Sequence, residues 1–405
     1  MTFSRTARVN GLIGAGHFLS HFYILCLPPL FLAWQDAFGV SFAELGLSVA
    51  LMAGATALLQ TPVGFLVDRY GARPFLIGGT LLMALPLATM GLATAYWQIL
   101  GLALLSGIGN SVFHPADYAI LAGSVDRERM GSSFALHTFT GNLGFAVAPF
   151  ATAAGMLLFG WRGTLMAFGL LGVPVVAALL WQGGVLRDQR RPAAADKTAA
   201  DAAAPRGAGL LLSRPILLFF GFFLTGSMAG SALQAWLITV LHEVNGLSLE
   251  SASSALTGYV AGGAAGTLIG GWMADRTTRH LPLTVVLTVL AAALMALAGL
   301  VPLAASATIA ALALAGLLTG ASRTPRDVML KDAAPPGEVG KVFGFVSAAL
   351  PLGQALTPAP FGLLIDWGRP DLVILVAAAL LLASLVFLRT ARRAARPATA
   401  PAPAE

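Results

Sequence analysis

Long apolar stretches alternate with short polar turns along almost the whole chain. A helix that crosses a membrane needs roughly 20 apolar residues in a row. Twelve stretches reach that length, at about 11–34, 43–67, 74–95, 97–122, 131–155, 161–182, 214–241, 250–274, 281–303, 307–330, 339–365 and 370–390. The pattern predicts an all-α membrane protein with twelve transmembrane helices, because a helix satisfies its own backbone hydrogen bonds in lipid.

Two segments interrupt this alternation. Residues 183–213 are rich in Ala, Pro, Arg and Asp, which predicts a flexible cytoplasmic linker. Residues 391–405 are also Ala, Pro and Arg, which predicts a disordered cytoplasmic tail. The expected organisation is an N-terminal six-helix bundle over 1–182 and a C-terminal six-helix bundle over 214–390.

Composition excludes several classes of protein. Of the 405 residues 57% are hydrophobic and only 10% are charged, whereas a soluble domain carries about 25% charged residues. The net charge of +6 is spread over short loops rather than gathered on one face, so no nucleic-acid partner is expected. The single cysteine, Cys26, excludes an internal disulfide and a cysteine-based metal cluster.

The basic residues give the orientation of the helices. With both termini on the cytoplasmic side, 22 of the 24 Lys and Arg residues fall on the inner side, and only Arg162 and Arg369 fall outside. This is the bias that the positive-inside rule describes, and an odd number of helices would destroy it. The sequence therefore predicts a multi-pass protein of the bacterial inner membrane.

The two halves of the chain repeat each other. The segment Gly64-Phe-Leu-Val-Asp68-Arg69-Tyr-Gly71-Ala-Arg73-Pro74 is followed 207 residues later by a weaker copy, Gly271-Trp-Met-Ala-Asp275-Arg276. In the fifth and eleventh apolar stretches, four more pairs are separated by 209 residues: Gly131 and Gly340, Phe134 and Phe343, Gly144 and Gly353, Pro149 and Pro358.

The first of these segments resembles the signature loop of the major facilitator superfamily, between the second and third membrane helices. The resemblance implies two pseudo-symmetric six-helix halves, with the substrate site between them near the midplane. It also implies that Asp68 faces the N-terminus of the eleventh helix, where the helix dipole favours an anion, and that Arg69 and Arg73 help to latch the halves together. Asp275 and Arg276 are the corresponding residues of the second half.

The glycines and the proline of this loop have a direct physical reading. Gly64 allows close approach to a neighbouring helix, and Gly71 permits a tight reversal of the chain. Pro74 fits the first turn of the third helix, where a missing N–H costs little. The alternative for the loop charges is that they only set the topology.

Ionisable residues inside membrane helices are costly and usually functional. The candidates on the fourth helix are His114 and Asp117, three residues apart and therefore on one face. A carboxylate beside an imidazole in a partly dry cavity can exchange a proton near neutral pH. Asp117, His114 and also His137 on the fifth helix are therefore the candidates for proton coupling. The alternative is that Asp117 pairs with Arg129 or Arg323.

The tenth helix carries the opposite charge. Arg323 is the candidate for binding an anionic substrate, whereas Arg326 and Asp327 lie nearer the inner end and are expected to act in a cytoplasmic gate. Weaker candidates for the substrate site are polar or aromatic residues of the first, seventh and eleventh helices: His17, His21, Gln234, Trp236 and Gln354.

No metal or cofactor site is predicted. His17 and His21 are four residues apart, but no HExxH motif or cysteine partner accompanies them, so ordinary buried hydrogen bonds are expected. The chain lacks a GxxxxGK[ST] loop for ATP and lacks the nucleophile motifs of hydrolases. The spaced glycines Gly262, Gly266 and Gly270 indicate close helix packing rather than a phosphate site.

These features predict a secondary active transporter that moves a small polar or anionic molecule by alternating access, and not an enzyme. Proton-coupled efflux of a drug or metabolite is the first choice, because residues 110–115 are similar to the fourth helix of the fosmidomycin-resistance type of exporter. The alternative is proton-coupled uptake of a small organic anion of the monocarboxylate kind. A membrane enzyme using the His and Asp residues, or a sensor with this fold, are further alternatives. The expected partners are substrate, protons and lipid, around a monomer.

Overall fold

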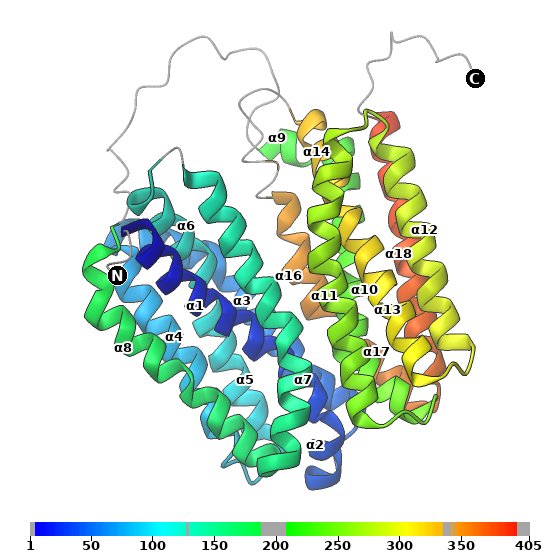
Figure 1. Cartoon of the computed structure of the whole chain (residues 1–405), viewed down its shortest axis with the longest axis horizontal. Helices are drawn as coiled ribbons and strands as arrows, with labels where there is room; N and C mark the ends of the chain where they lie inside the picture. Colours follow the sequence, from blue (N-terminus) through cyan, green and yellow to red (C-terminus); the bar gives the residue numbers. More distant parts are fainter. Residues whose placement is uncertain (1–4, 127–128, 188–207, 335–341, 343–344, 395–405) are drawn as a thin grey trace.

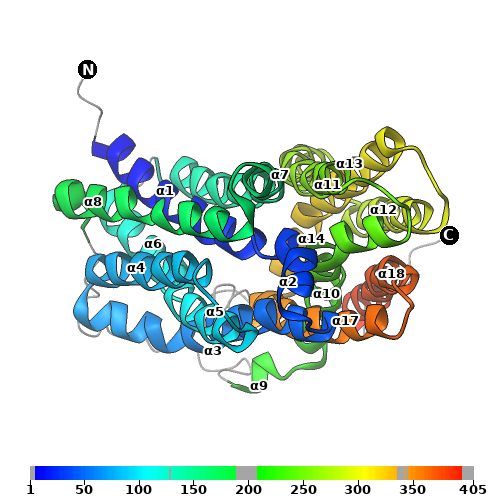
Figure 2. The same ribbon diagram turned by 90° about the horizontal axis from the view of Figure 1, so that it is seen from below.

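A computed structural model describes residues 5–126, 129–187, 208–334, 342 and 345–394, which Figure 1 draws as ribbon. Within these ranges the regular structure is helical throughout, as the apolar pattern predicts. The chain forms two helical bundles that lie side by side (Figures 1 and 2). Each bundle is made by one half of the sequence, which agrees with the internal repeat.

The N-terminal bundle contains six membrane-crossing helical segments, several of which are bent. Its elements are α1 (Arg5–Leu25), η1 (Pro28–Leu30), α2 (Phe31–Phe38), α3 (Phe42–Tyr70), α4 (Ala72–Met90), α5 (Tyr96–Asn110), α6 (Phe113–Ser124), α7 (Met130–Leu170), α8 (Gly172–Gln182) and η3 (Gly183–Val185).

The C-terminal bundle repeats this arrangement. Its elements are α9 (Ala208–Leu211), α10 (Arg214–Glu243), α11 (Leu249–Asp275), α12 (His280–Leu300), α13 (Ala305–Ala321), α14 (Arg323–Ala333), α16 (Ala349–Leu356), α17 (Pro358–Asp366) and α18 (Asp371–Ala394). Part of the expected linker is regular, since η3 and α9 lie at its two ends. Residues 188–207 between them, and the expected tail from 395 onward, lie outside the described residues, as Figure 1 indicates in grey.

Ten helical segments are long and apolar enough to cross a membrane. Two further observations raise the number of membrane crossings in the described residues to twelve. The segment Leu136–Val185 is 50 residues long and turns back at Gly160, whose φ of 62° is left-handed. It therefore contains two crossings, as predicted. Helix α11 has 27 residues, enough for a crossing of about 40 Å, but its many Gly, Ser and Thr residues make it less apolar.

Several of the predicted helices are interrupted inside the membrane region, among them the first, the fourth and the tenth. The first changes direction at η1, where Pro28 and Pro29 cannot donate backbone hydrogen bonds. The fourth divides into α5 and α6 at Ser111, and the tenth divides into α13 and α14 at Ser322. In each of these two cases a proline, Pro115 or Pro325, lies within the first turn that follows the bend.

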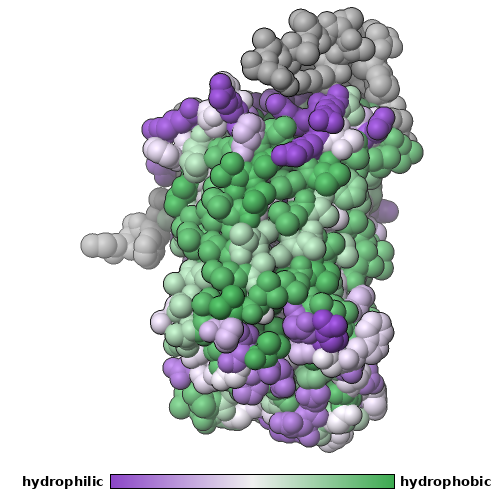
Figure 3. All heavy atoms as spheres, turned by 90° about the vertical axis from the view of Figure 1, so that its right-hand side faces the viewer, coloured by the Kyte–Doolittle hydropathy of each residue, from purple (hydrophilic) through white to green (hydrophobic). Residues whose placement is uncertain are grey.

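The outer surface of the bundles is apolar. Figure 3 shows a hydrophobic band across the visible face of the C-terminal bundle, with hydrophilic residues gathered at its two ends. On the other bundle, Leu157 and Trp181 expose 81% and 85% of their surface. Large apolar side chains exposed to this extent on both halves are suited to contact with lipid. The chain is a multi-pass membrane protein.

The two halves close against each other at the end that carries α2 and α17. The carboxylate of Asp366 on α17 accepts hydrogen bonds from the backbone N–H groups of Phe42 and Ala43, at 2.7 and 2.8 Å. These N–H groups begin α3, so a carboxylate from one half caps a helix of the other. Toward the opposite end, where α1 begins and α18 ends, the bundles diverge (Figure 1).

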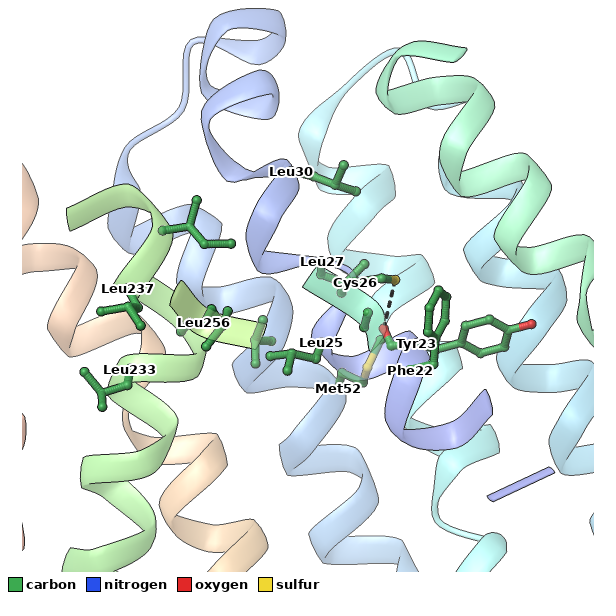
Figure 4. Packing of buried hydrophobic residues seen from close by; sticks show 14 of the residues in the cluster. Phe22, Tyr23, Leu25, Cys26, Leu27, Leu30, Met52, Leu233, Leu237 and Leu256 are labelled. Carbon is green, nitrogen blue, oxygen red and sulfur yellow. Dashed lines mark hydrogen bonds between the residues drawn. The ribbon is translucent and has the colours of Figure 1, made fainter. Parts of the chain in front are cut away.

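Close to this closure, a single hydrophobic cluster joins both halves. Figure 4 shows Leu25, Leu27 and Met52 of the N-terminal half together with Leu233 and Leu256 of the C-terminal half. All five are buried, so water is excluded from this contact between the halves.

Glycines set the closest helix contacts, as the sequence predicts. A Cβ atom on Gly262, Gly266 or Gly270 of α11 would collide with the backbone of α13, so the small-residue ladder does mark close packing. Gly71 forms the single-residue connection between α3 and α4 with a φ of 92°, which confirms the predicted reversal of the chain.

We expect Gly46→Ala to shift the protein away from this closed arrangement. A Cβ at Gly46 would lie 2.5 Å from the carbonyl oxygen of Pro358 in the other half, closer than atoms in contact allow. Spin labels placed on α2 and α17 should therefore report longer distances in the variant. Gly101→Ala is the matched control, because a Cβ there meets no atom within 4 Å. Unchanged distances in Gly46→Ala would contradict the assignment of this contact as the closure.

Candidate functional site

Two separate groups of polar and charged side chains inside the bundles contain most of the candidate substrate and proton-coupling residues. One lines a cavity in the C-terminal half, and the other is a buried cluster of histidines and one aspartate in the N-terminal half. If the ionisable residues of the first, fourth and tenth helices all lined the single substrate site that the resemblance implies, they would lie together between the halves. The structure separates them instead.

The cavity has a volume of about 260 Å³, slightly below the range of roughly 300–1,000 Å³ that is typical of ligand sites. This volume suits a small molecule. The walls come mainly from α10, α11, α13, α14 and α16, and the N-terminal half contributes Asn142 and Phe145 of α7. The polar residues of the wall are Asn142, Ser227, Ser231, Gln234, Tyr259, Thr288, Thr319, Ser322, Arg323, Arg326, Gln354 and Ser384.

Two guanidinium groups make the cavity cationic. Arg326 contacts Asp327, with 3.0 Å between Nε and Oδ1, and its guanidinium carbon lies 4.1 Å from the ring centre of Phe223. In the described part of the chain, Arg323 has no acidic partner within 4 Å. A guanidinium without a directly contacting acid, beside amide and hydroxyl groups, is suited to bind a carboxylate or phosphate through the paired geometry that arginine favours.

The second group, here called the histidine cluster, consists of His17 and His21 of α1, His114 and Asp117 of α6, and His137 of α7. Its best-defined contact joins Asp117 and His137, with 3.0 Å between Oδ2 and Nε2. Asp117 is completely buried and His137 is 2% exposed. His137 also stacks on His17, with 3.6 Å between ring centres, and its carbonyl oxygen accepts a hydrogen bond from Nδ1 of His17 at 2.8 Å.

The local sequence explains why these side chains meet. His17 and His21 lie one helical turn apart on α1 and face α7, which approaches closely because Gly141 has no side chain. A Cβ at Gly141 would lie 2.6 Å from Cε1 of His17 and would also collide with His21. The bend at Ser111 begins the helix that carries His114 and Asp117. Three helices therefore supply the cluster, and one glycine makes room for it.

The partner of Asp117 differs from each sequence-based expectation. The acid does not pair with Arg129 or Arg323, and its imidazole partner is His137 rather than His114 on its own helix. His114 instead faces His17 and His21, at 5.3 and 6.1 Å between ring centres. Helix periodicity correctly placed His114 and Asp117 on one side of α6, but only the packing of α7 brings His137 to the carboxylate.

Among the substrate candidates, Gln234, Gln354 and Arg323 line the cavity. Trp236 lies outside it. Its ring is fully buried, its Nε1 donates to the carbonyl oxygen of Pro358 at 2.8 Å, and it packs against Phe31 of the other half. In this conformation Trp236 therefore belongs to the contact between the halves. His21 lies behind the cavity wall, because its ring centre is 4.4 Å from that of Phe145, which lines the cavity.

The residues of the signature loop lie at the diverging end. Arg73 donates to the carbonyl oxygen of Leu180 within its own half, at 3.1 Å. Arg69 lies over the ring of Tyr70, and Arg276 over that of Trp272. A Cβ at Gly64 would lie 3.7 Å from Cβ of Pro115, which is an ordinary contact distance. The side chains of Asp68 and Asp275 lie outside the described residues, so their predicted contacts stay predictions.

Several cavity residues are not among the candidates that the sequence suggests. Asn142 and Phe145 lie on α7, and Tyr259 lies on α11. Each stands in a run of small or apolar residues with no recognisable motif. The one signal in the sequence that could identify any of them is the polarity of Asn142 within an otherwise apolar span.

The fold and the motifs agree with a comparison to protein families. The family model described as Major Facilitator Superfamily matches residues 13–307 and 227–405. The chain belongs to the Major Facilitator Superfamily. This membership confirms the resemblance found in the signature loop, and it confirms the expectation of a transporter-family protein rather than an enzyme.

Individual relatives within the superfamily differ in what they do. The chain is 28% identical over 279 residues to the fosmidomycin resistance protein of Escherichia coli K12, covering 67% of this chain and 66% of that protein. It is 26% identical to the membrane sensor protein UhpC of the same organism, covering 58% and 57%. It is 27% identical to the 4-hydroxybenzoate transporter PcaK of Pseudomonas aeruginosa PAO1, covering 61% of each chain. The chain thus spans little more than half the length of some relatives.

A solved structure supports the fold over the full length. A bacterial homologue of the human lysosomal transporter Spinster, in an inward-facing and occupied conformation, superimposes with a TM-score of 0.76. The match covers 98% of this chain and 97% of that one at 16% identity. At this identity the similarity establishes the major facilitator fold and not the substrate.

Proposed function

We propose that this protein is a proton-coupled secondary transporter that moves a small anionic molecule across the bacterial inner membrane by alternating access. The observation that carries the proposal is the separation of two kinds of site. A cationic cavity containing Arg323 and Arg326 lies in the C-terminal half, and a buried carboxylate–imidazole pair lies in the N-terminal half. One half is suited to hold the substrate, and the other is suited to hold a proton.

The Asp117–His137 pair has the chemistry of a proton carrier. A carboxylate buried without charge compensation is costly, so the pair is expected to hold a proton while it is enclosed. Nδ1 of His137 and Oδ1 of Asp117 have no hydrogen-bond partner within the described residues, which leaves each a place for that proton. A rocking motion that admits water to the cluster would release it.

The conformation fits one step of such a cycle. The halves are closed at the α2–α17 end by Asp366 and the hydrophobic cluster, and they diverge at the end where α1 begins and α18 ends, as Figure 1 shows. If both termini are cytoplasmic, this is an inward-facing state, with the cavity accessible from the cytoplasm. The signature loop residues Asp68, Arg69 and Arg73, with Asp275 and Arg276, would then meet across the halves only after the protein turns outward.

The proposed direction of transport is efflux. The relatives include the fosmidomycin resistance protein and the multidrug resistance protein MdtH, which is 28% identical over 114 residues. Uptake of a small organic anion is the second candidate. It is favoured by the two arginines in the cavity and by relatives named for 4-hydroxybenzoate and L-galactonate, both of which are carboxylates. The proposed working unit is the monomer, because both sites lie within one chain.

Inside-out vesicles with an acidic interior test this proposal directly. A pH-sensitive dye would follow the gradient while fosmidomycin, 4-hydroxybenzoate, L-galactonate and a cationic drug are added in turn. We expect an anion of this panel, and not the cation, to dissipate the gradient in vesicles containing the protein. Proton movement with efflux would be seen as alkalinisation of the interior. If none of the anions moves protons in either vesicle orientation, the proposal is overturned.

A further inference from the structure

Three histidines of the cluster have an arrangement that proton coupling does not require. We propose that His17, His21 and His114 form a binding site for a divalent transition-metal ion inside the N-terminal bundle. The sequence alone predicts no metal site, because the pair on α1 has no third ligand nearby in the chain. The third imidazole comes from α6, and only the folded bundle supplies it.

The distances between the three rings fit one shared ion. Their centres are 4.4, 5.3 and 6.1 Å apart, and their planes are inclined to each other by 66–83°. Three imidazoles on a tetrahedral ion, with metal–nitrogen distances of about 2.0–2.1 Å, would have ring centres about 5 Å apart. One nitrogen from each ring already lies within 4.8 Å of one nitrogen from each of the others. Small side-chain rotations therefore suffice to bring the three nitrogens to one ion.

The hydrogen bond made by His17 sets the protonation that a ligand needs. Its Nδ1 lies 2.8 Å from the carbonyl oxygen of His137, and because a carbonyl only accepts, Nδ1 must carry the proton. The other nitrogen, Nε2, is then an unprotonated acceptor. Metal-binding histidines almost always have such a partner on the second nitrogen, which fixes the tautomer and the ring orientation.

In the described part of the chain, each of the three rings has one buried nitrogen without a hydrogen-bond partner. Within the described residues, Nε2 of His17, Nδ1 of His21 and Nδ1 of His114 are buried and make no hydrogen bond. His17 is only 3% exposed. An unsatisfied buried polar group is costly, and each of these three nitrogens carries that cost. A metal ion would satisfy all three lone pairs at once.

The donor set selects the class of ion. Neutral imidazole nitrogens suit Zn²⁺, Co²⁺, Ni²⁺ and Cu²⁺, whereas Ca²⁺ and Mg²⁺ need oxygen ligands. The carboxylate of Asp117, on the same helix as His114, offsets part of the positive charge. The ring of Phe145 lies between His21 and the cavity, so an ion that enters from the cavity must displace this ring.

Metal binding to the purified full-length protein in detergent tests the site without any transport. The protein should carry no polyhistidine tag, and Co²⁺ and Zn²⁺ are the probes. We expect one equivalent of Co²⁺ with visible absorption bands of nitrogen coordination, displaced by Zn²⁺ and unaffected by Mg²⁺. His21→Ala and His114→Ala should each weaken Zn²⁺ binding at least about 100-fold, since losing even an outer-shell partner costs roughly 10–100-fold.

The chain offers matched controls for this experiment. His242 and His280 lie in the C-terminal half, on α10 and α12, and His242→Ala with His280→Ala should leave the single equivalent unchanged. Thermal unfolding in the absence of metal would verify that each variant is folded. Binding that survives in both His21→Ala and His114→Ala, or a wild type that binds no Zn²⁺, would overturn the proposal. Neither result would bear on proton coupling through Asp117.

Discussion

Asp117→Asn is expected to abolish proton-driven transport, reducing it to the level of vesicles without the protein. Asparagine has nearly the same shape as aspartate and can still accept a hydrogen bond from His137, which lies 3.0 Å from the carboxylate. It cannot bind or release a proton in the relevant pH range. The bundle should therefore fold, while the buried pair loses the proton that couples the gradient to movement of the substrate.

A second readout separates lost coupling from a damaged protein. Exchange of labelled substrate for unlabelled substrate at equal pH on both sides needs no net proton movement, so Asp117→Asn should retain it. Asp36→Asn, on an exposed position of α2, is the matched control and should behave as wild type in both assays. If Asp117→Asn still accumulates substrate against its gradient, another group carries the proton.

Arg323→Gln is expected to weaken binding of the anionic substrate by about 30-fold or more. Removing one member of a buried, hydrogen-bonded charge pair costs about 2 kcal/mol or more, and 1.4 kcal/mol corresponds to a tenfold change in affinity. Arg323 lines the cavity without an acidic partner within 4 Å in the described structure, so the substrate itself is its proposed counter-ion. Direct titration of the substrate into purified protein gives the dissociation constant.

The comparison with Arg323→Lys indicates how the group acts. Lysine keeps the charge but loses the planar pair of donors, so it should bind with intermediate affinity if arginine holds the anion through two hydrogen bonds. Arg279→Gln removes an exposed charge next to α12 and should leave affinity unchanged. Equal affinities of wild type and Arg323→Gln would show that the anion binds elsewhere.

These two variants also test the separation of the sites. Asp117→Asn should change coupling and leave substrate affinity nearly intact, whereas Arg323→Gln should change affinity first. Mutations at sites that share no partners usually act independently. A strong effect of Asp117→Asn on affinity would instead indicate that the substrate contacts the histidine cluster.

The sequence by itself determined the class of protein, because membrane crossing is a local property of the chain. A run of about 20 apolar residues identifies a helix without knowledge of its neighbours. The glycine turn at Gly71, the half-chain repeat and the Asp68-Arg69 loop are equally local. These local features predict the twelve membrane helices, the two halves and the superfamily without any knowledge of tertiary contacts.

The tertiary structure alone decided which polar side chains meet, because that depends on how helices rotate and bend against each other. Helix periodicity placed His114 beside Asp117. The packing of α7, however, brings His137 into contact with the carboxylate, and His114 lies next to His17 and His21 instead. The missing side chain at Gly141 permits that approach. In the same way, Trp236 looked like a cavity residue, but the closure of the halves buries it against Pro358 and Phe31. Long-range packing, which leaves no periodic signal in one sequence, sets the chemistry of both sites.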